Sequence, residues 1–326
     1  MNELLPTVFI SEPIDAKGLH KLEGFANIVL APDTSRDTTI ALLAQADAAI
    51  LRATTIFDEE VIRAGVNLKV IARTGVGVNN VDLKAAGKQG IYVCNTPGTN
   101  DDTVAEHTMA LILALAKQLF TMDRAVRNQH WGERFSPRQM DLQGKRVGII
   151  GYGNIGQATA RLCDCFGMHV TVYDPFVDQK VSGISFTEDL SRIFRLSDFV
   201  CLHCPVTSIT KGLVGKKYLD LMHSGAYLIN TSRGELIDED ALVEALTHKK
   251  IAGAALDVFE TEPVGAASPF LQFPDVILSP HVAGSTKESN ERIAVAAAQA
   301  VIDVLSGKTP QHVCNSEYLT SLQNSR

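Results

Sequence analysis

The 326-residue chain has no run of lysine or arginine residues and no apolar segment long enough to cross a membrane. Its formal net charge is -7, which makes nucleic acid and anionic membranes poor candidates as partners. The first residues, MNELLPTVFISEP, include Glu3 and lack the basic segment of a signal peptide. We therefore expect a cytoplasmic protein that binds neither nucleic acid nor a membrane.

Cysteine is also sparse, with six residues, of which Cys201 and Cys204 form a C-x-x-C pair. No second pair lies at the spacing of a zinc site. The surrounding run DFVCLHCP has the pattern of a buried strand, in which residues three apart point to opposite faces. We therefore expect no metal site, no redox role for this pair and a reducing compartment.

No tandem repeat or low-complexity linker divides the chain, and short apolar runs alternate with helical patterns instead. Strands are predicted at 7–11, 27–31, 48–52, 69–73 and 91–95, and again at 146–150, 169–174, 198–204, 226–231, 253–259 and 275–279. Such alternation is typical of parallel sheets covered by helices. It predicts an α/β protein of two doubly wound parallel-sheet domains.

Three further expectations concern helices and the chain end. Thr103 and Glu106 have the capping-box spacing that starts a helix through 109–116. A late helix within 290–307 is expected to pack back on the first block. The last sixteen residues are polar and are expected to form a surface tail.

The segment KRVGIIGYGNIGQATARL places Gly151, Gly153 and Gly156 between a predicted strand and a predicted helix. The first glycine permits the tight turn, the second lets the backbone approach a pyrophosphate, and the third lets the helix pack on the strand. Asp174 ends the next strand, 18 residues after Gly156. Its carboxylate can accept ribose hydroxyls and would repel a 2′-phosphate, so the motif predicts NAD rather than NADP.

Ligands of an open parallel sheet gather past the carboxyl ends of its strands. The charged residues predicted there are Arg52, Arg73, Arg233, Asp257, Glu262 and His281. The set suits hydride transfer between NAD and a 2-hydroxy acid, because an arginine can hold the substrate carboxylate and a histidine can exchange the hydroxyl proton. A carboxylate beside the histidine would hold its tautomer. We expect Arg233, Glu262 and His281 in these three roles, with the backbone of Gly75 and Gly77 donating to the substrate carboxylate.

These features resemble the D-isomer-specific 2-hydroxyacid dehydrogenase family over nearly the whole chain. The motifs that carry the resemblance are RTGVGVNNVDL, NTPGTNDDTVAEHTMALILAL, GKRVGIIGYGNIG, INTSRGELIDEDALVEAL, AGAALDVFETEP and SPHVAGST. The resemblance implies NAD as cofactor, Arg233, Glu262 and His281 as catalytic residues, and a homodimer joined through the cofactor domains. It also implies a flavodoxin-like substrate-binding domain of residues 1–101 and 290–326, into which a Rossmann NAD-binding domain of residues 102–289 is inserted.

The resemblance also implies a wider set of contacts. Asp257 would contact the nicotinamide carboxamide, Pro205 would line the nicotinamide ribose, and Thr231 would lie by the nicotinamide. The expected cofactor-binding residues are Gly151, Gly153, Asn154, Ile155, Gly156, Asp174, Cys204, Pro205, Thr231, Asp257 and Gly284, and the expected substrate-binding residues are Arg52, Arg73, Val76 and Gly77.

Within the family, the sequence is most similar to the phosphoglycerate dehydrogenase branch, in a short form without a regulatory domain. Arg52 and Arg73 suggest a second anionic group on the substrate, as in 3-phosphoglycerate and phosphohydroxypyruvate. Hydroxypyruvate/glyoxylate reductase and sulfolactate dehydrogenase remain alternatives, and a non-catalytic NAD-sensing scaffold is an alternative of another class. A formate-dehydrogenase-like enzyme is disfavoured, because a His–Glu pair suits a substrate hydroxyl.

Overall fold

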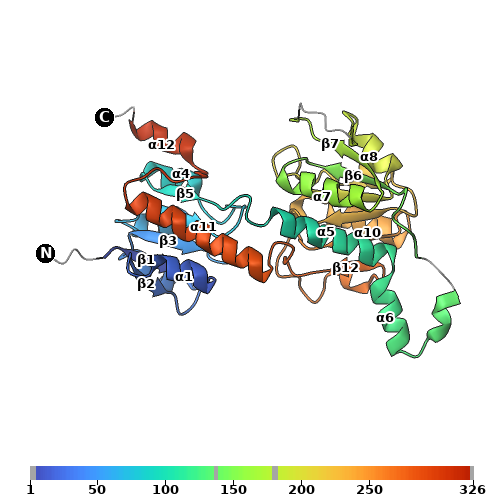
Figure 1. Cartoon of the computed structure of the whole chain (residues 1–326), viewed down its shortest axis with the longest axis horizontal. Helices are drawn as coiled ribbons and strands as arrows, with labels where there is room; N and C mark the ends of the chain where they lie inside the picture. The colour runs from blue at the N-terminus through green and yellow to red at the C-terminus, as the bar shows by residue number, and fades with distance from the viewer. Residues whose placement is uncertain (1–4, 136–138, 178–182, 324–326) are drawn as a thin grey trace. The chain divides into compact units, whose positions relative to one another are not determined.

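The computed structural model describes residues 5–135, 139–177 and 183–323. The chain divides into two compact units, one formed by Met1–Asn100 with Ser285–Arg326 and the other by Asp101–Gly284. We call them unit 1 and unit 2. Each contains a parallel sheet with helices packed on it (Figure 1), so the predicted pair of doubly wound α/β domains is confirmed.

The unit 1 sheet has the order β2-β1-β3-β4-β5, and every neighbouring pair is parallel. Its strands are β1 (Thr7–Ile10), β2 (Asn27–Leu30), β3 (Ala48–Leu51), β4 (Val70–Arg73) and β5 (Tyr92–Cys94). Its helices are α1 (Ala16–Leu22), α2 (Arg36–Leu43), α3 (Glu59–Ala64), α4 (Leu83–Lys88), α11 (Lys287–Leu305) and α12 (Ser316–Gln323). The strand order is that of flavodoxin-like sheets, with the reversal of direction between β1 and β3.

The end of the chain packs on unit 1. Helix α11 contacts α1 as well as β3 and β4, which confirms the predicted return of the late helix. The two helices approach so closely that a Cβ at Gly18 would lie 2.7 Å from the Cβ of Ala294. The predicted surface tail is wrong for residues 316–323, which form α12, because Tyr318 packs over Gly87 of α4. Residues 324–326 of that predicted tail lie outside the described residues. Residues 1–4, which belong to the segment expected to lack a signal peptide, also lie outside them.

The unit 2 sheet has the order β12-β11-β10-β9-β6-β7-β8 and is also parallel. Its strands are β6 (Arg146–Ile150), β7 (His169–Tyr173), β8 (Ser185–Phe186), β9 (Phe199–Leu202), β10 (Tyr227–Asn230), β11 (Gly253–Leu256) and β12 (Val276–Leu278). Strand β6 is central and the order reverses between β6 and β9, which is the arrangement of dinucleotide-binding sheets. The short edge strand β8 was not predicted, because two residues leave no hydrophobic period to detect.

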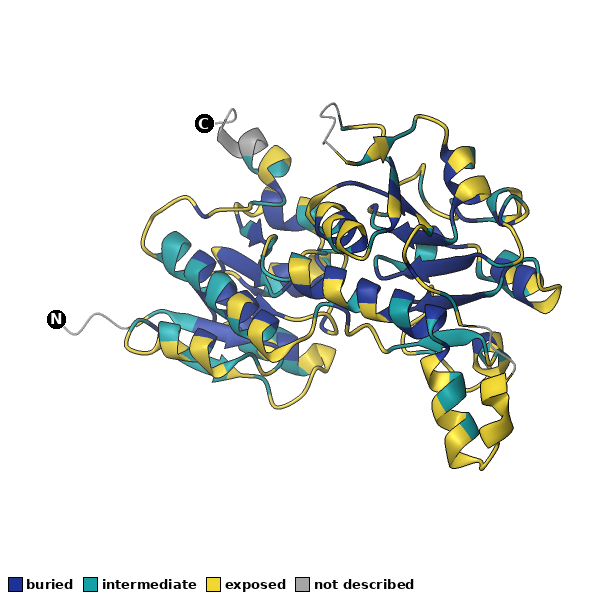
Figure 2. Ribbon diagram, turned by 45° about the vertical axis from the view of Figure 1, so that its right-hand side comes forward, coloured by how far each residue is buried: buried dark blue, intermediate teal, exposed yellow. Residues whose placement is uncertain are grey.

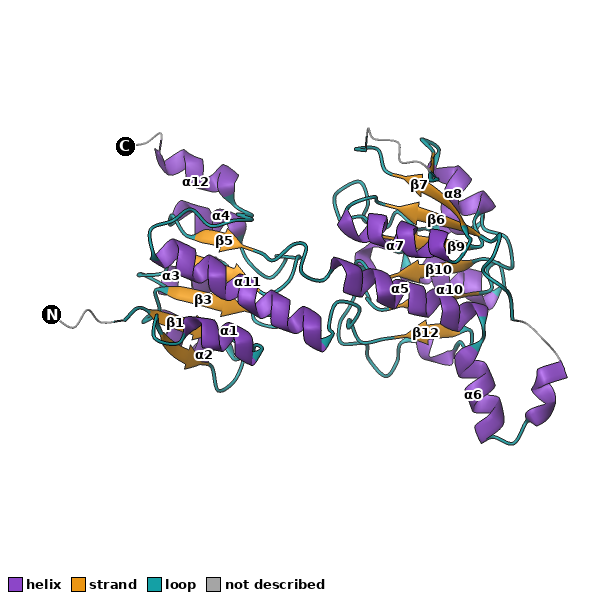
Figure 3. Cartoon of the chain, in the orientation of Figure 1, coloured by secondary structure: helices purple, strands orange, loops and turns teal. Residues whose placement is uncertain are grey.

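The helices of unit 2 are α5 (Asp101–Ala116), α6 (Leu119–Arg127), α7 (Asn154–Cys165), α8 (Leu190–Leu196), α9 (Lys216–Leu219) and α10 (Glu239–Thr247), with the 3-10 turns η1 (Trp131–Phe135), η2 (Gly234–Leu236) and η3 (Pro269–Gln272). Most helices of unit 2 lie along its sheet, whereas α6 projects away from it (Figure 3). The predicted start of α5 at Thr103 is wrong. Asp101 and Asp102 occupy the first turn, where negative charge favours a helix N-terminus, and Thr103 is buried inside the helix.

The core of unit 2 is buried, whereas α6 and η1 are not (Figure 2). Strands β9, β10 and β11 are buried along their whole length, as expected for central strands covered on both faces. Helix α6 and η1 have no buried residue. Within the described ranges, no helix is long and apolar enough to cross a membrane.

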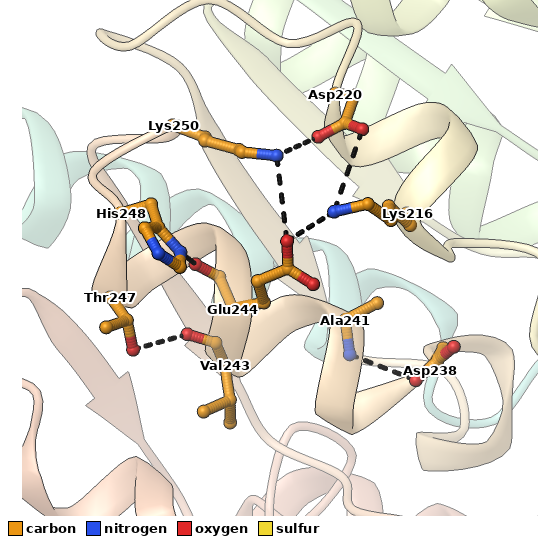
Figure 4. Close-up of polar contacts among 9 residues, drawn as sticks. All are labelled: Lys216, Asp220, Asp238, Ala241, Val243, Glu244, Thr247, His248 and Lys250. Carbon is orange, nitrogen blue, oxygen red and sulfur yellow. Dashed lines mark hydrogen bonds and ion pairs between the residues drawn. The ribbon is translucent and has the colours of Figure 1, made fainter.

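Exposed ion pairs connect α9 to α10 and to the turn that follows α10 (Figure 4). Lys216 pairs with Glu244, and Lys250 pairs with Asp220. Two longer contacts of 4.0 Å, Lys216–Asp220 and Lys250–Glu244, close the network. Exposed pairs contribute little to stability, so we expect this network to add little to the stability of unit 2.

Candidate active site

The glycine loop between β6 and α7 has the geometry of a pyrophosphate cradle. Gly151 has a φ of +95°, and a Cβ there would lie 2.7 Å from the carbonyl oxygen of His203. A Cβ at Gly156 would lie 2.2 Å from the carbonyl oxygen of Gly151. At Gly153 a Cβ would meet nothing within 4 Å, so this backbone faces open space. The N-terminus of α7 has no side-chain cap, which leaves its N–H groups available to an anion, and the residues present therefore fit a dinucleotide.

Asp174 follows β7 and is bound to the glycine loop. Its Oδ2 accepts the N–H of Tyr152 at 2.7 Å, and its Oδ1 accepts the N–H of Phe176 at 2.9 Å. An ionised carboxylate has further acceptor sites, so it can still receive ribose hydroxyls. Asp174 therefore lies beside the glycine loop, as predicted for a residue that favours NAD over NADP.

The loop after β9 holds Cys204 and Pro205. Cys204 is buried, and burial raises the pKa of its thiol to about 11. Its carbonyl oxygen accepts the hydroxyl of Ser232 at 2.8 Å, which links this loop to the one that carries Arg233. Cys201 lies within β9, whereas Cys204 lies beyond the end of the strand. The observed strand is therefore shorter than the predicted strand 198–204.

The three adjacent strands β10, β11 and β12 are followed by Arg233, Glu262 and His281. The Nδ1 of His281 lies 2.7 Å from Oε2 of Glu262, and Oε1 of the same carboxylate accepts the N–H of Phe259 at 3.0 Å. One carboxylate therefore fixes both the backbone of its own loop and the imidazole. The side chain of His281 is 46% exposed, which leaves the ring accessible to a reactant at Nε2.

The loop that carries Arg233 is held by the buried side chain of Asn230. The Oδ1 of Asn230 accepts the N–H of Ser232 at 3.0 Å, and its Nδ2 donates to the carbonyl oxygen of Arg233 at 2.8 Å. Gly234, which was not predicted, has a packing role, because a Cβ there would lie 1.9 Å from the carbonyl carbon of Phe259. Arg233 thus lies on a loop that packs against the residues leading to Glu262, and its Nη1 donates to the carbonyl oxygen of Ser232 at 2.6 Å.

Asp257 lies after β11 and is completely buried. Its Oδ1 accepts the Ser279 hydroxyl at 2.6 Å and the N–H of Val282 at 3.0 Å, and its Oδ2 accepts the N–H of Ala283 at 2.8 Å. Its carbonyl oxygen accepts the N–H of His281 at 2.8 Å. The structure therefore places Asp257 as the anchor of the His281 loop, and its contact with a nicotinamide stays a prediction.

The remaining residues predicted to bind the cofactor lie on neighbouring elements of unit 2. Asn154 and Ile155 open α7, and Thr231, which follows β10, is buried. Gly284 closes the loop that carries His281 and is the last residue of unit 2. The structure thus has these predicted residues where the sequence placed them, in loops and helix ends at the carboxyl edge of one sheet.

In unit 1, Arg73 ends β4 and folds over the glycine loop that follows. Its Nη1 donates to the carbonyl oxygen of Thr74, and a Cβ at Gly75 would collide with that guanidinium. The expectation that the Gly75 N–H binds a carboxylate is wrong, because this N–H donates to the Thr96 hydroxyl at 2.9 Å. Gly77 remains a predicted backbone donor, and Val76 remains a predicted substrate-binding residue.

Arg52 follows β3 and is exposed, and its Nη1 donates to the carbonyl oxygen of Pro13 at 2.9 Å. The carboxylate of Glu12 was not predicted. It accepts the hydroxyl of Ser11, the N–H groups of Arg52 and Thr54 at 3.3 and 3.2 Å, and the hydroxyl of Thr55 at 3.2 Å. Burial raises the pKa of Glu12, but the hydrogen bonds from Ser11, Thr54 and Arg52 outweigh burial and lower it. An ionised carboxylate therefore lies directly at the end of β3.

Comparison with known proteins agrees with this geometry. Residues 109–283 match the sequence family described as "D-isomer specific 2-hydroxyacid dehydrogenase, NAD binding domain". The chain is 38% identical to the glyoxylate reductase of Thermofilum pendens, over 96% of each protein. It is also 38% identical to the D-3-phosphoglycerate dehydrogenase of Synechocystis sp., over 96% of this chain but 56% of that protein. Thus it spans little more than half of that longer relative.

A solved structure with the same arrangement is the TT0316 protein of Thermus thermophilus. It superposes with a TM-score of 0.88 at 32% identity, over 94% of this chain and 99% of that one.

Proposed function

Because the chain belongs to the D-isomer specific 2-hydroxyacid dehydrogenase family and is an NAD-dependent oxidoreductase, we propose that Arg233, Glu262 and His281 interconvert a D-2-hydroxy acid and its 2-oxo acid. The observation that carries this proposal is the 2.7 Å contact between Nδ1 of His281 and Oε2 of Glu262. That contact directs the other ring nitrogen to the reactant.

The chemistry follows from what each side chain can do. NAD, held at the glycine loop of Gly151, Gly153 and Gly156, would supply the hydride acceptor for C2 of the hydroxy acid and, when reduced, the hydride donor for C2 of the oxo acid. His281 takes the hydroxyl proton at Nε2 during oxidation and returns it during reduction. Glu262 keeps the proton on Nδ1 and stabilises the imidazolium as it forms. Arg233 holds the C1 carboxylate through a bidentate contact, which fixes C2 for the transfer.

We assign the cofactor to unit 2 and the substrate-binding residues of the N-terminal block to unit 1. The glycine loop with its open face at Gly153 supports the first assignment, and the Arg73 guanidinium over Gly75 supports the second. We therefore expect a variant with an altered glycine loop in unit 2 to bind NADH weakly. Variants of Arg73 should change kcat and KM for the substrate without changing the affinity for NADH.

For the substrate, we propose a 2-oxo acid with a distal anionic group, of which phosphohydroxypyruvate is the first choice and sulfopyruvate the second. Arg73 is the main support, because its guanidinium lies against Thr74 and Gly75, directly before Val76 and Gly77. Both guanidinium groups donate to a backbone carbonyl oxygen, and Arg52 is the weaker support because it is exposed whereas Arg73 is half-buried.

One observation favours glyoxylate or hydroxypyruvate as the second candidate. The ionised carboxylate of Glu12 lies at the Arg52 N–H and would repel a distal anion placed there. The full-length similarity to a glyoxylate reductase agrees with this alternative.

A substrate panel with matched variants tests the proposal. We expect NADH oxidation with phosphohydroxypyruvate to exceed that with glyoxylate in kcat/KM. Arg73→Gln should narrow this difference and Glu12→Gln should widen it, whereas Arg63→Gln, which breaks an exposed helical ion pair, should change neither. If glyoxylate is the best substrate in every variant, the distal-anion assignment is wrong and the second candidate stands.

Turnover itself separates an enzyme from a non-catalytic NAD-sensing scaffold. His281→Ala should lose about 10²- to 10⁴-fold in kcat with unchanged NADH affinity, and Glu262→Gln should lose less. A protein that binds NADH but reduces none of the six 2-oxo acids phosphohydroxypyruvate, hydroxypyruvate, sulfopyruvate, glyoxylate, pyruvate and 2-oxoglutarate would be a scaffold.

We further propose that the protein is a homodimer joined through unit 2. The support is a set of exposed apolar side chains on α6 and η1, namely Leu119, Phe120, Val126, Trp131 and Phe135, each at least 54% exposed. A second copy would cover them, as exposed apolar patches commonly mark interfaces. Light scattering should give twice the 35.2 kDa chain mass, and Phe120→Ser with Phe135→Ser should lower it to one chain.

We place the protein in the cytoplasm. All six cysteines are free thiols, as expected in a reducing compartment. A thiol assay of the unfolded chain without reductant should therefore count six reactive groups, and a lower count would contradict this placement.

A further inference from the structure

Two neighbouring residues of α5, His107 and Thr108, contact two different loops of the candidate active site. Thr108 contacts Thr231, which begins the loop of Arg233. His107 contacts Ser279, which begins the loop of His281. Neither α5 residue was among the predicted site residues.

The contact of Thr108 fixes the direction of a hydroxyl. Thr108 is completely buried, and its hydroxyl donates to the carbonyl oxygen of Val104 at 2.9 Å. A hydroxyl has one proton, so at the 2.9 Å contact with Thr231 the oxygen of Thr108 accepts and the Thr231 hydroxyl donates. The lone pairs of Thr231 are thereby turned away from α5, and the start of the Arg233 loop is attached to the helix.

The contact of His107 fixes a chain of donors by the same reasoning. The Ser279 hydroxyl donates its proton to Oδ1 of Asp257 at 2.6 Å. Towards Nε2 of His107, 3.2 Å away, the Ser279 oxygen can therefore only accept, which requires a proton on Nε2 of His107. A chain of hydrogen bonds thus begins at His107 on α5, passes through Ser279 and ends at the buried carboxylate of Asp257.

The loop at the end of this chain needs such support. His281 has a φ of +53°, in the left-handed region that residues with a side chain seldom adopt. Such a conformation persists only when the surroundings hold it. Three consecutive N–H groups, those of His281, Val282 and Ala283, donate to Asp257. The N–H of His281 bonds to the carbonyl oxygen of Asp257, and those of Val282 and Ala283 bond to its carboxylate, so Asp257 holds the loop on which His281 lies.

We propose that His107 and Thr108 are positioning residues, which hold the loops of His281 and Arg233 in their reactive arrangement from a single helix. The inference rests on the proposed function of those two loops. Neither residue touches the reactants, so each acts through the residue that it contacts, Ser279 or Thr231.

Paired variants separate positioning from mere folding. His107→Leu and Thr108→Val remove the hydrogen bonds, whereas His107→Gln and Thr108→Ser keep a donor or a hydroxyl at the same place. Glu106→Gln, at the exposed neighbouring position on α5, is the control. We expect about five- to tenfold lower kcat in the first two variants, since a neutral hydrogen bond contributes about a factor of five. NADH affinity should be unchanged, and the two conservative variants should restore most of the activity.

Amide hydrogen exchange supplies a measurement that does not depend on turnover. Thr108→Val should speed exchange at Ser232, and His107→Leu should speed it at His281, Val282 and Ala283, each about tenfold and without change in β6. Uniformly faster exchange throughout unit 2, or no change in either loop, would overturn the inference. A wild-type protein without turnover would refute the proposed function, and the exchange pattern would still decide whether α5 positions the loops.

Discussion

His203, which follows β9, makes the stability of unit 2 depend on pH. Its ring Nε2 is shielded from solvent and, among the described residues, has no hydrogen-bond partner. Burial lowers the pKa of this imidazole from 6.5 to about 4. The folded chain therefore binds fewer protons at this site than the unfolded chain between these two values.

Proton linkage determines the direction and the size of the pH effect on the unfolding free energy. A histidine whose pKa is lowered by folding contributes its full share of stability above pH 6.5 and loses it as the pH falls towards 4. At pH 5 the unfolded imidazole is protonated and the folded one is not, which costs about 2 kcal/mol of unfolding free energy relative to pH 7.5. The loss approaches about 3 kcal/mol near pH 4.

His203→Leu removes the titrating group and leaves no unpaired ring nitrogen. We would measure urea unfolding of both proteins between pH 7.5 and 4.5 and plot the difference in unfolding free energy, so that titration of the shared groups cancels. The difference should change in favour of the variant by about 2 kcal/mol at pH 5. Parallel curves over this range would refute the argument from burial.

Three further predictions concern the site. Asp174→Ala should relax the preference for NAD over NADP, and equal kcat/KM for both cofactors in the native protein would contradict its role. Arg233→Lys should recover little activity, because a point charge cannot reproduce the guanidinium fork, and near-native kcat/KM would refute the anchor. Gly153→Ala should weaken NADH binding at unchanged stability, whereas Gly156→Ala should also lower the melting temperature, because its Cβ would lie 2.2 Å from the Gly151 oxygen.

The sheets and the glycine loop could be predicted because their signals are local. Alternating apolar runs mark the strands, and the spacing of Gly151, Gly153 and Gly156 marks the turn that joins β6 to α7. The positions of Arg233 and His281 after strands were equally readable. Parallel strands bring such residues to one edge of a sheet without any knowledge of side-chain contacts.

Contacts between distant segments could not be predicted in this way. Apart from the bond with Ser11, Glu12 receives its hydrogen bonds from a loop 40 to 43 residues later, and His107 contacts Ser279 across 172 residues. Nothing in the local pattern of either residue distinguishes it from a solvated side chain. The loop contacts of Asp257 could not be predicted for a related reason, since a carboxylate past a strand end can face a ligand or its own loop.

The chain leaves unit 1 after Asn100 and returns at Ser285, and this topology has a consequence for gene architecture. The Nε of Arg292 donates to the carbonyl oxygen of Thr99 at 2.8 Å, so the point of departure lies beside α11. Ser285 precedes Arg292 by seven residues, mostly helical, or about 10 Å. A linker of about four to six residues could therefore join Asn100 to Ser285 and delete unit 2 entirely. Unit 1 would then become one continuous segment of a single gene, which the nearness of the two junctions permits.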